Sequence, residues 1–276
     1  QVFLSNGSDD ILNFAFMAFG ADGAVFPALT YSFYPVFANL HGVAYETVPL
    51  REDFTLDVAG MQGKGKLTVF PNPNAPTGIA LPLDQVEAIV ASNPDHVVVV
   101  DEAYVDFGAD SAVPLLQKYE NLLVVMTYSK SRSMAGARLG FALGSRTLLQ
   151  DLEKLKYSTN PYNVNRLTLK LGQAAVDSDG YFREKAREIM ATREKTAQAL
   201  RALSFTLPDS QANFLFVAHP KVAGETLYRK CKEKGVLIRH FSDPAIAAYN
   251  RVTIGTPAEM EAFLAVVQTI LKEEGA

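Results

Sequence analysis

The stretch VVVVDEAY, residues 97–104, is the part of the sequence that decides the fold. Its four valines are apolar toward both faces, which is typical of a central parallel strand covered by helices on each side. Asp101, Glu102 and Tyr104 follow where this strand should end. In open α/β sheets, ligands bind at the carboxyl ends of the strands. Polar residues at this point are therefore candidate site residues.

Further short β-rich runs lie on both sides of this stretch and alternate with helical patterns. Strands are predicted at residues 2–4, 24–26, 67–70, 122–126 and 139–143, and helices at residues 11–19 and 83–92. Ser8 or Asp9 is placed to cap the first of these helices. Strands that alternate with helices indicate an α/β fold with a mostly parallel central sheet between helices.

The pattern changes in the second half of the chain. A long amphipathic helix is predicted from Gly180 to Leu203. Its solvated face should carry Lys185, Arg187, Glu188 and Arg193. Strands at 213–217, 236–238 and 252–254 follow, with helices at 223–234 and from Pro257 to the end. We interpret residues 1–165 as a large domain and residues 166–276 as a smaller α+β domain entered through the long helix.

Composition narrows the classes of protein that this chain can belong to. Of its 276 residues 48% are hydrophobic and 20% charged, as in an average globular protein. A net charge of −4 does not favour nucleic-acid binding, and no apolar run is long enough to span a membrane. Cys231 is the single cysteine, which fits a reducing, cytoplasmic location. The four histidines show no metal-ligand spacing, so no metal is expected.

Three predicted strands deliver polar side chains to one edge of the sheet. The strand at 67–70 is followed by PNPNAPTG, residues 71–78, and the strand at 122–126 by TYSK, residues 127–130. Arg138 stands eight residues after Lys130. Because the carboxyl ends of parallel strands meet at one edge, these residues should converge with those of DEAY.

In order and spacing these motifs resemble the aspartate-aminotransferase-like, fold type I family of pyridoxal-phosphate enzymes. Within that family NGSDD at 6–10, residues 27–31 and RVTIGT at 251–256 are most similar to the histidinol-phosphate aminotransferases. The resemblance covers nearly the whole chain from Asn6 onward. It also implies a first segment that this sequence lacks, because the chain opens at Gln1 with a strand-like run. The resemblance implies that 276 residues are fewer than the working enzyme has.

The resemblance implies pyridoxal 5′-phosphate as the cofactor and assigns residues to it. Lys130 is expected to bind the cofactor aldehyde covalently and then to carry the proton as general base and acid. Asp101 is expected to pair with the ring nitrogen, and Tyr104 and Asn74 with the ring hydroxyl. Asn74 is preferred to Asn72 because Ala75 occupies the other candidate position and has no amide. The remaining cofactor contacts are expected from Ser8, Asp9, Tyr31, Thr127, Ser129 and Arg138.

The implied reaction is transfer of the amino group of histidinol phosphate to 2-oxoglutarate, a step of histidine biosynthesis. Arg251 matches the arginine that binds the carboxylate or other anionic end of the substrate, and Arg239 one that contacts the substrate phosphate. The implied partners are the small-molecule amino donor and oxo acid, with a homodimer whose active sites lie near the subunit boundary. No nucleic acid and no membrane is expected as a partner.

Three alternatives stay open at this point. The chain resembles aromatic amino-acid aminotransferases and threonine-phosphate decarboxylases of the same fold, which differ in substrate. The lack of the family's first segment leaves room for a truncated or non-catalytic homologue. A nicotinamide-dependent enzyme is disfavoured, because no GxGxxG follows the first strand.

Overall fold

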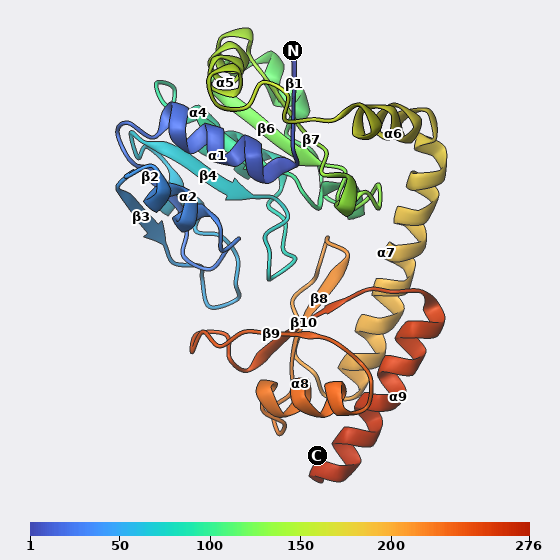
Figure 1. Cartoon of the computed structure of the whole chain (residues 1–276). Helices are drawn as coiled ribbons and strands as arrows, with labels where there is room; N and C mark the ends of the chain where they lie inside the picture. Colours follow the sequence, from blue (N-terminus) through green and yellow to red (C-terminus); the bar gives the residue numbers. More distant parts are fainter.

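The computed structural model describes residues 1–276 and contains a seven-stranded sheet with the order β1-β7-β6-β5-β4-β2-β3 (Figure 1). Its strands are β1 (Val2–Ser5), β2 (Ala24–Pro27), β3 (Tyr45–Val48), β4 (Leu67–Pro71), β5 (Val98–Asp101), β6 (Leu122–Thr127) and β7 (Gly140–Gly144). Strands β3, β2, β4, β5 and β6 are parallel, whereas β7 and β1 pair antiparallel at one edge. The predicted α/β fold with a mostly parallel sheet is confirmed.

Helices cover both faces of this sheet. They are α1 (Ser8–Phe19), α2 (Tyr34–Leu40), α3 (Val58–Met61), α4 (Leu83–Ala91) and α5 (Arg146–Thr159), with short 3-10 turns η1 (Val105–Phe107), η2 (Val113–Gln117) and η3 (Ala135–Ala137). Val99 packs in the core with residues of α1, α2 and α5, whereas Val98 and Val100 pack on the opposite face with residues of α3 and α4. The run of valines therefore lies in a strand with two buried faces.

Strand register brings the carboxyl ends of β4, β5 and β6 together. Asp101 lies opposite Pro71 of β4 and Val125 of β6. Thr127, the last residue of β6, lies opposite Gly140 of β7. Residues that follow these strands in sequence therefore leave the sheet at one edge, as the motifs predicted.

A second, smaller sheet has the order β8-β10-β9. Its elements are β8 (Phe214–Ala218), α8 (Gly224–Glu233), β9 (Arg239–His240), β10 (Tyr249–Thr253) and α9 (Pro257–Glu274). Thr256 and Glu259 form a reciprocal capping box that starts α9. The core of this part joins the sheet to α8, α9 and the end of α7 (Asp179–Ala202), from which Ala197 and Leu200 contribute.

Helix α7 runs along one side of the molecule from the large part to the small one, and its end packs in the core of the second sheet (Figure 1). Before it, α6 (Arg166–Asp177) still contacts the large sheet, because the Thr168 hydroxyl donates to the carbonyl of Ala137 at 2.8 Å. We propose a division into two domains between residues 165 and 166. Helix α7 then belongs to the smaller domain, although Arg193 of α7 also contacts the larger one. None of the helices is both long and apolar enough to cross a membrane.

Three local predictions are wrong. Residues 236–238 form no strand, since Leu237 is 78% exposed and β9 holds only Arg239 and His240. Neither Ser8 nor Asp9 caps α1, because the N-cap is Gly7 with a φ of 84°. Arg193 is buried rather than solvated, and its Nη1 donates to two carbonyl oxygens, those of Phe107 and Ala212, both at 2.9 Å.

Candidate active site

A cavity of about 140 Å³ lies at the carboxyl edge of the large sheet. Residues from β5, β6, the start of α1 and the loop before α2 line it. Nine of the thirteen lining residues are site residues predicted from sequence, and these are Ser8, Asp9, Tyr31, Asp101, Tyr104, Thr127, Ser129, Lys130 and Arg138. The fold therefore gathers side chains that stand up to 130 positions apart in the sequence.

One side of the cavity is built from hydroxyl groups and a guanidinium. The Thr127 hydroxyl donates to Ser129 Oγ at 2.9 Å, and Arg138 Nη1 lies 3.5 Å from the same oxygen. Arg138 adopts a left-handed conformation with a φ of 54°, which is uncommon for a residue with a side chain and is found at functional sites. The loop after β6 is thus shaped to turn Arg138 back toward Ser129.

The start of α1 completes this side. Helix α1 begins at Ser8, so the backbone N–H groups of Ser8 and Asp9 have no partner within the helix and can bind an anion. A side chain at Gly7 would collide with Arg138, since its Cβ would lie 2.5 Å from Nη2. Gly140 of β7 passes equally close, with its Cβ position 2.4 Å from the Ser8 nitrogen. Because Gly7 and Gly140 have no side chains, the first turn of α1, strand β7 and the Arg138 guanidinium can lie in contact.

The opposite side of the cavity holds a buried carboxylate. Asp101 is 4% exposed, and its two oxygens accept hydrogen bonds from the Tyr34 hydroxyl at 2.9 Å and the Ala103 N–H at 3.2 Å. Burial raises the pKa of Asp101 to about 6, and these two hydrogen bonds oppose the rise because they stabilise the charged form. The amine of Lys130 also favours the ionised carboxyl group.

Lys130 and Tyr104 lie between these two sides. The Lys130 side chain is exposed to the cavity, with Nζ 5.3 Å from the centre of the Tyr104 ring. Tyr104 packs edge-on against Phe214 of β8 at 5.1 Å between ring centres, so the second sheet supports it. The accessible amine thus stands near both a phenol and a buried carboxylate.

Tyr31 is fixed at its hydroxyl. It donates to Asp9 Oδ1 at 2.8 Å, and the other oxygen of Asp9 is 3.3 Å from Arg138 Nη2. Burial, followed by this hydrogen bond to Asp9, raises the pKa of Tyr31 far above its usual value. Tyr31 is therefore neutral at physiological pH and presents its ring to the cavity.

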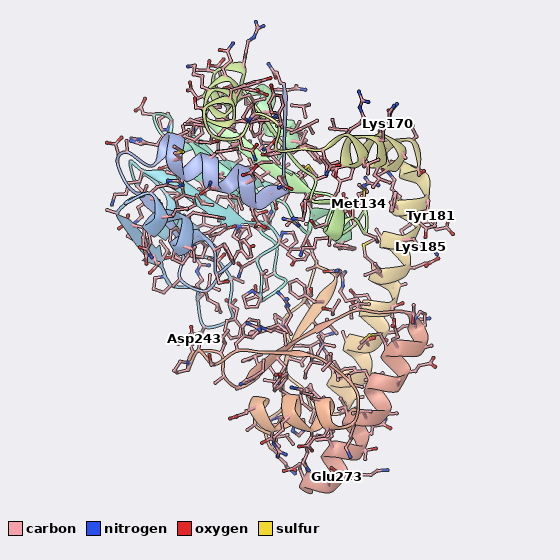
Figure 2. The ribbon with its side chains drawn as sticks, in the orientation of Figure 1. Met134, Lys170, Tyr181, Lys185, Asp243 and Glu273 are labelled. Carbon is pink, nitrogen blue, oxygen red and sulfur yellow. The ribbon has the colours of Figure 1, made fainter.

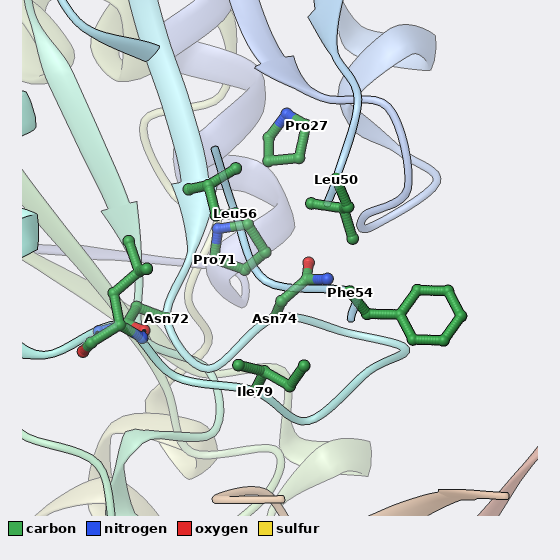
Figure 3. A pocket seen from close by; sticks show the side chains of 9 residues that line it. Pro27, Leu50, Phe54, Leu56, Pro71, Asn72, Asn74 and Ile79 are labelled. Atoms are coloured by element: carbon green, nitrogen blue, oxygen red, sulfur yellow. Dashed lines mark hydrogen bonds between the residues drawn. The ribbon is translucent and has the colours of Figure 1, made fainter. Parts of the chain in front are cut away.

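Asn74 does not line this cavity, contrary to the sequence prediction. Its Nδ2 donates to the carbonyl of Leu29 at 3.2 Å and to the Thr77 hydroxyl at 3.1 Å, and its Oδ1 accepts from Thr30. Figure 3 shows the side chain in a small neighbouring recess beside Pro71, Phe54 and Ile79. Ala75 takes the place in the cavity wall. Asn74 thus holds loops together, and Tyr104 is left as the phenol facing Lys130.

A larger cleft of about 900 Å³ lies between the two sheets. Arg239 and Arg251 line it, together with Tyr31 and Ala75, which also line the first cavity. The cavity and the cleft therefore adjoin at Tyr31 and Ala75.

The two arginines stand directly opposite each other on β9 and β10. Each guanidinium lies over an aromatic ring, Arg239 over Phe241 at 5.6 Å and Arg251 over Phe214 at 5.0 Å. Four arginines between residues 166 and 276 pair with carboxylates, as Arg201 does with Asp209 at 2.6 Å, but neither Arg239 nor Arg251 forms an ion pair. Both positive charges are thus available to a ligand.

Sequence reasoning missed the buried Tyr34 and gave no role to the buried Glu102. Tyr34 is fully buried beneath the site and touches Asp101, and Glu102 accepts from the Ser111 hydroxyl and the Ala112 N–H. Burial raises the pKa of Glu102 to about 7. No spacing signal pointed to Tyr34, because Tyr31 lies in the loop before α2 and Tyr34 is the first residue of that helix.

Asp101 should make the stability of the cofactor-free protein depend on pH. Its pKa is about 6 in the fold, against an ordinary value of 3.8 for an aspartate side chain. The protonated form therefore stabilises the fold below about pH 3.8, and this contribution is lost as the pH rises through 6. Relative to Asp101→Asn, wild type should lose roughly 3 kcal/mol of unfolding free energy over this window.

Urea unfolding of both proteins at pH 4 and pH 7 measures this difference. Burial is the main cause of the raised pKa of Glu102 and is the same in both proteins, but the Asp101 charge also contributes, so the measured difference belongs to Asp101 together with its effect on Glu102. Parallel pH profiles for the two proteins would contradict the assignment of Asp101 as a destabilising buried charge.

The donor set fits pyridoxal 5′-phosphate. The hydroxyls, guanidinium and free N–H groups on one side suit a phosphate, and the buried carboxylate on the other side suits a protonated ring nitrogen. A lysine amine between them suits an aldehyde. The fold and the site thus fit an α/β enzyme that uses pyridoxal phosphate.

The comparisons with known proteins give the family. The family model for aminotransferase class I and II matches residues 1–267, and the chain belongs to this family. The chain is 46% identical to "Histidinol-phosphate aminotransferase" of Brachyspira hyodysenteriae, with 99% of this chain and 78% of that protein covered. It is 48% identical to "Histidinol-phosphate aminotransferase 1" of Bordetella parapertussis, with 98% and 77% covered.

A solved structure shows the same fold. The histidinol-phosphate aminotransferase of Sinorhizobium meliloti, in complex with pyridoxal-5′-phosphate, has a TM-score of 0.86 and 22% identity, with 99% of this chain and 77% of that chain covered.

Proposed function

We propose that the protein is a pyridoxal-phosphate-dependent aminotransferase that converts histidinol phosphate and 2-oxoglutarate to imidazole acetol phosphate and glutamate, in histidine biosynthesis. Membership of the aminotransferase family and the names of relatives at 46% and 48% identity support this proposal. The single observation that carries the choice of substrate is that Arg239 and Arg251 lie side by side in the cleft and that neither forms an ion pair with a carboxylate.

Two like charges directly opposite each other on neighbouring strands repel and cost stability. Arg239 and Arg251 occupy such positions, and no carboxylate of the chain pairs with either. An anion that enters the cleft would relieve this repulsion and form charge-assisted hydrogen bonds. A phosphate or a carboxylate on the substrate meets this requirement, and a substrate carrying a phosphate uses two arginines better than a plain amino acid does.

Within the first cavity we assign roles to residues of this chain. Pyridoxal phosphate, when bound, supplies an electron sink for the charge that develops on the substrate carbon. Lys130 would hold the cofactor through its aldehyde, and its Nζ would carry the proton as general base and acid. Asp101 would hold the ring nitrogen in its protonated form, and the Tyr104 hydroxyl would hold the ring oxygen.

The remaining residues hold the cofactor in place. Arg138, the hydroxyls of Thr127 and Ser129 and the N–H groups of Ser8 and Asp9 would hold the phosphate. Tyr31, fixed by Asp9, would hold the ring.

We also propose that the enzyme is a cytoplasmic homodimer. Large apolar side chains gather on the exposed segment from the end of α5 to the start of α7, where Figure 2 shows Tyr181 pointing outward. These side chains are Tyr157, Tyr162, Leu167, Leu169, Leu171, Val176 and Tyr181, between 45% and 90% exposed. A clustered apolar surface of this kind is typical of a protein interface, and a second copy of the chain is the partner we propose. The single buried thiol of Cys231 fits a reducing compartment.

The test of the proposed function is turnover of three amino donors by the purified chain with pyridoxal phosphate and 2-oxoglutarate. We expect kcat/KM for histidinol phosphate to exceed that for phenylalanine by at least about 100-fold, because a phosphate can bind both arginines at once and a carboxylate satisfies them less well, a difference worth roughly 3 kcal/mol. Preference for phenylalanine would indicate an aromatic aminotransferase, and release of carbon dioxide from threonine phosphate a decarboxylase. No change in the cofactor's absorption on mixing with the protein would indicate a non-catalytic homologue.

A further inference from the structure

The buried hydroxyl of Tyr34 has no partner except the candidate carboxylate. Tyr34 is 0% exposed at the first position of α2, and its ring packs against those of Phe16, Phe26 and Tyr31. A phenylalanine would fill this aromatic cluster equally well. The hydroxyl makes one hydrogen bond, to Asp101 Oδ2 at 2.9 Å. A buried polar group is costly unless it is bonded, so the phenol is present because of the carboxylate.

Asp101 in turn has few donors for a buried carboxylate. An ionised carboxylate can accept about four hydrogen bonds, but the protein gives Asp101 only two, from Tyr34 and from the Ala103 N–H at 3.2 Å. The Tyr34 bond is the shorter of the two. Among the influences that keep the pKa of Asp101 from rising further, the hydrogen bond from Tyr34 is the largest. The negative charge of Asp9 raises the pKa of Asp101, whereas the positive charge of Lys130 lowers it, as the Tyr34 hydrogen bond does.

We propose that Tyr34 is a positioning residue for the cofactor: its hydroxyl holds one oxygen of Asp101 from inside the large domain and so keeps the carboxylate ionised and oriented toward the ring nitrogen. This inference rests on the proposed function, because it takes pyridoxal phosphate as the ligand of the cavity. Tyr34 itself lines neither the cavity nor the cleft and touches no substrate.

The proposal makes a specific demand on the ligand. If Tyr34 acts through Asp101 on the ring nitrogen, its removal should weaken only ligands that have this nitrogen. The matched probes are pyridoxal phosphate and its analogue in which carbon replaces the ring nitrogen. A merely structural role for Tyr34 would change the binding of both alike.

The experiment titrates the full chain with each probe and follows the absorption of the bound aldehyde. For Tyr34→Phe we expect the Kd of pyridoxal phosphate to rise about tenfold, as for loss of a hydrogen bond to a charged group. The Kd of the carbon analogue should change less than about twofold. Adding Tyr34→Phe to Asp101→Asn should leave the Kd of pyridoxal phosphate unchanged, since the two changes act on one interaction.

Tyr45→Phe is the matched control. Its ring stacks on Phe26 of the same cluster at 5.0 Å, and it makes no hydrogen bond to Asp101, so both affinities should remain those of wild type. The ratio of the two dissociation constants within each variant does not depend on the folded fraction, so partial unfolding does not obscure the result. Equal weakening of both probes, or of neither, overturns the proposal. Failure of wild type to bind pyridoxal phosphate at all would instead overturn the proposed function.

Discussion

Lys130→Ala is expected to lower the rate of amino transfer by on the order of 10⁵-fold, which is the largest effect of any single substitution in this chain. The Lys130 amine is the only one lining the cavity, so no neighbouring side chain can take its place. Both covalent binding of the cofactor aldehyde and proton transfer depend on it in our proposal. Single-turnover absorption spectra with histidinol phosphate measure the loss.

Two controls make this result specific. Lys156→Ala removes a lysine that lies near Phe3, away from the cavity, and should leave the rate within about twofold of wild type. Borohydride reduction of the protein with bound pyridoxal phosphate should label the peptide containing Lys130 in wild type but not in Lys130→Ala. Labelling of another lysine in wild type would refute the assignment.

Arg239→Ala is expected to lower kcat/KM for histidinol phosphate by about 100-fold, while kcat/KM for phenylalanine changes less than about threefold. Arg239 is exposed in the cleft, lies opposite Arg251 and has no internal partner, so its removal affects the ligand rather than the fold. Removing one of two repelling charges should leave the melting temperature unchanged or slightly higher. Steady-state kinetics with both substrates and thermal unfolding test these expectations.

Arg201→Ala is the control for this experiment, because Arg201 lies at the end of α7 and pairs with Asp209 at 2.6 Å outside the cleft. It should behave as wild type with both substrates. Equal losses on both substrates in Arg239→Ala would argue against Arg239 as the phosphate contact. Arg239→Lys should recover only part of the rate, because an ammonium group cannot donate the paired hydrogen bonds of a guanidinium.

Local sequence signals predicted the parts of the fold that follow from strand burial. The valines before Asp101 identified β5 because a strand between two helical layers must be apolar on both faces. The edge strand β3 was missed because Tyr45–Val48 alternates between exposed and partly buried residues and lacks such a run. The strand predicted at 236–238 failed because an apolar triplet does not establish a pairing partner, and Leu237 is exposed.

The residues of the candidate site also fall into those that local sequence signals predict and those that they do not. Residues directly after β5 and β6 were predictable, because the ends of parallel strands converge whatever else the chain does. Asn74 was misplaced because two neighbouring residues in a loop point in different directions, and sequence alone does not show which one faces the cavity. Tyr34 bonds a residue 67 positions away and Arg193 one 86 positions away, and no local pattern reports such contacts.

The buried Arg193 also fixes where the two parts of the molecule are joined. Its guanidinium donates to the carbonyl of Phe107 in the large part and to that of Ala212 in the small part. Tyr104, three residues before Phe107, contacts Phe214, two residues after Ala212, and so joins the same two segments. Arg239 and Arg251 line the cleft from strands β9 and β10 of the same small part (Figure 1). Phe54 of the large part adds a further contact, because its ring packs edge-on against those of Phe216 and Tyr249 at 5.6 and 5.1 Å. Arg251 lies over the same Phe214 ring that supports Tyr104, so a shift of the second sheet against the large one would act on an anion contact and on the phenol beside Lys130 together.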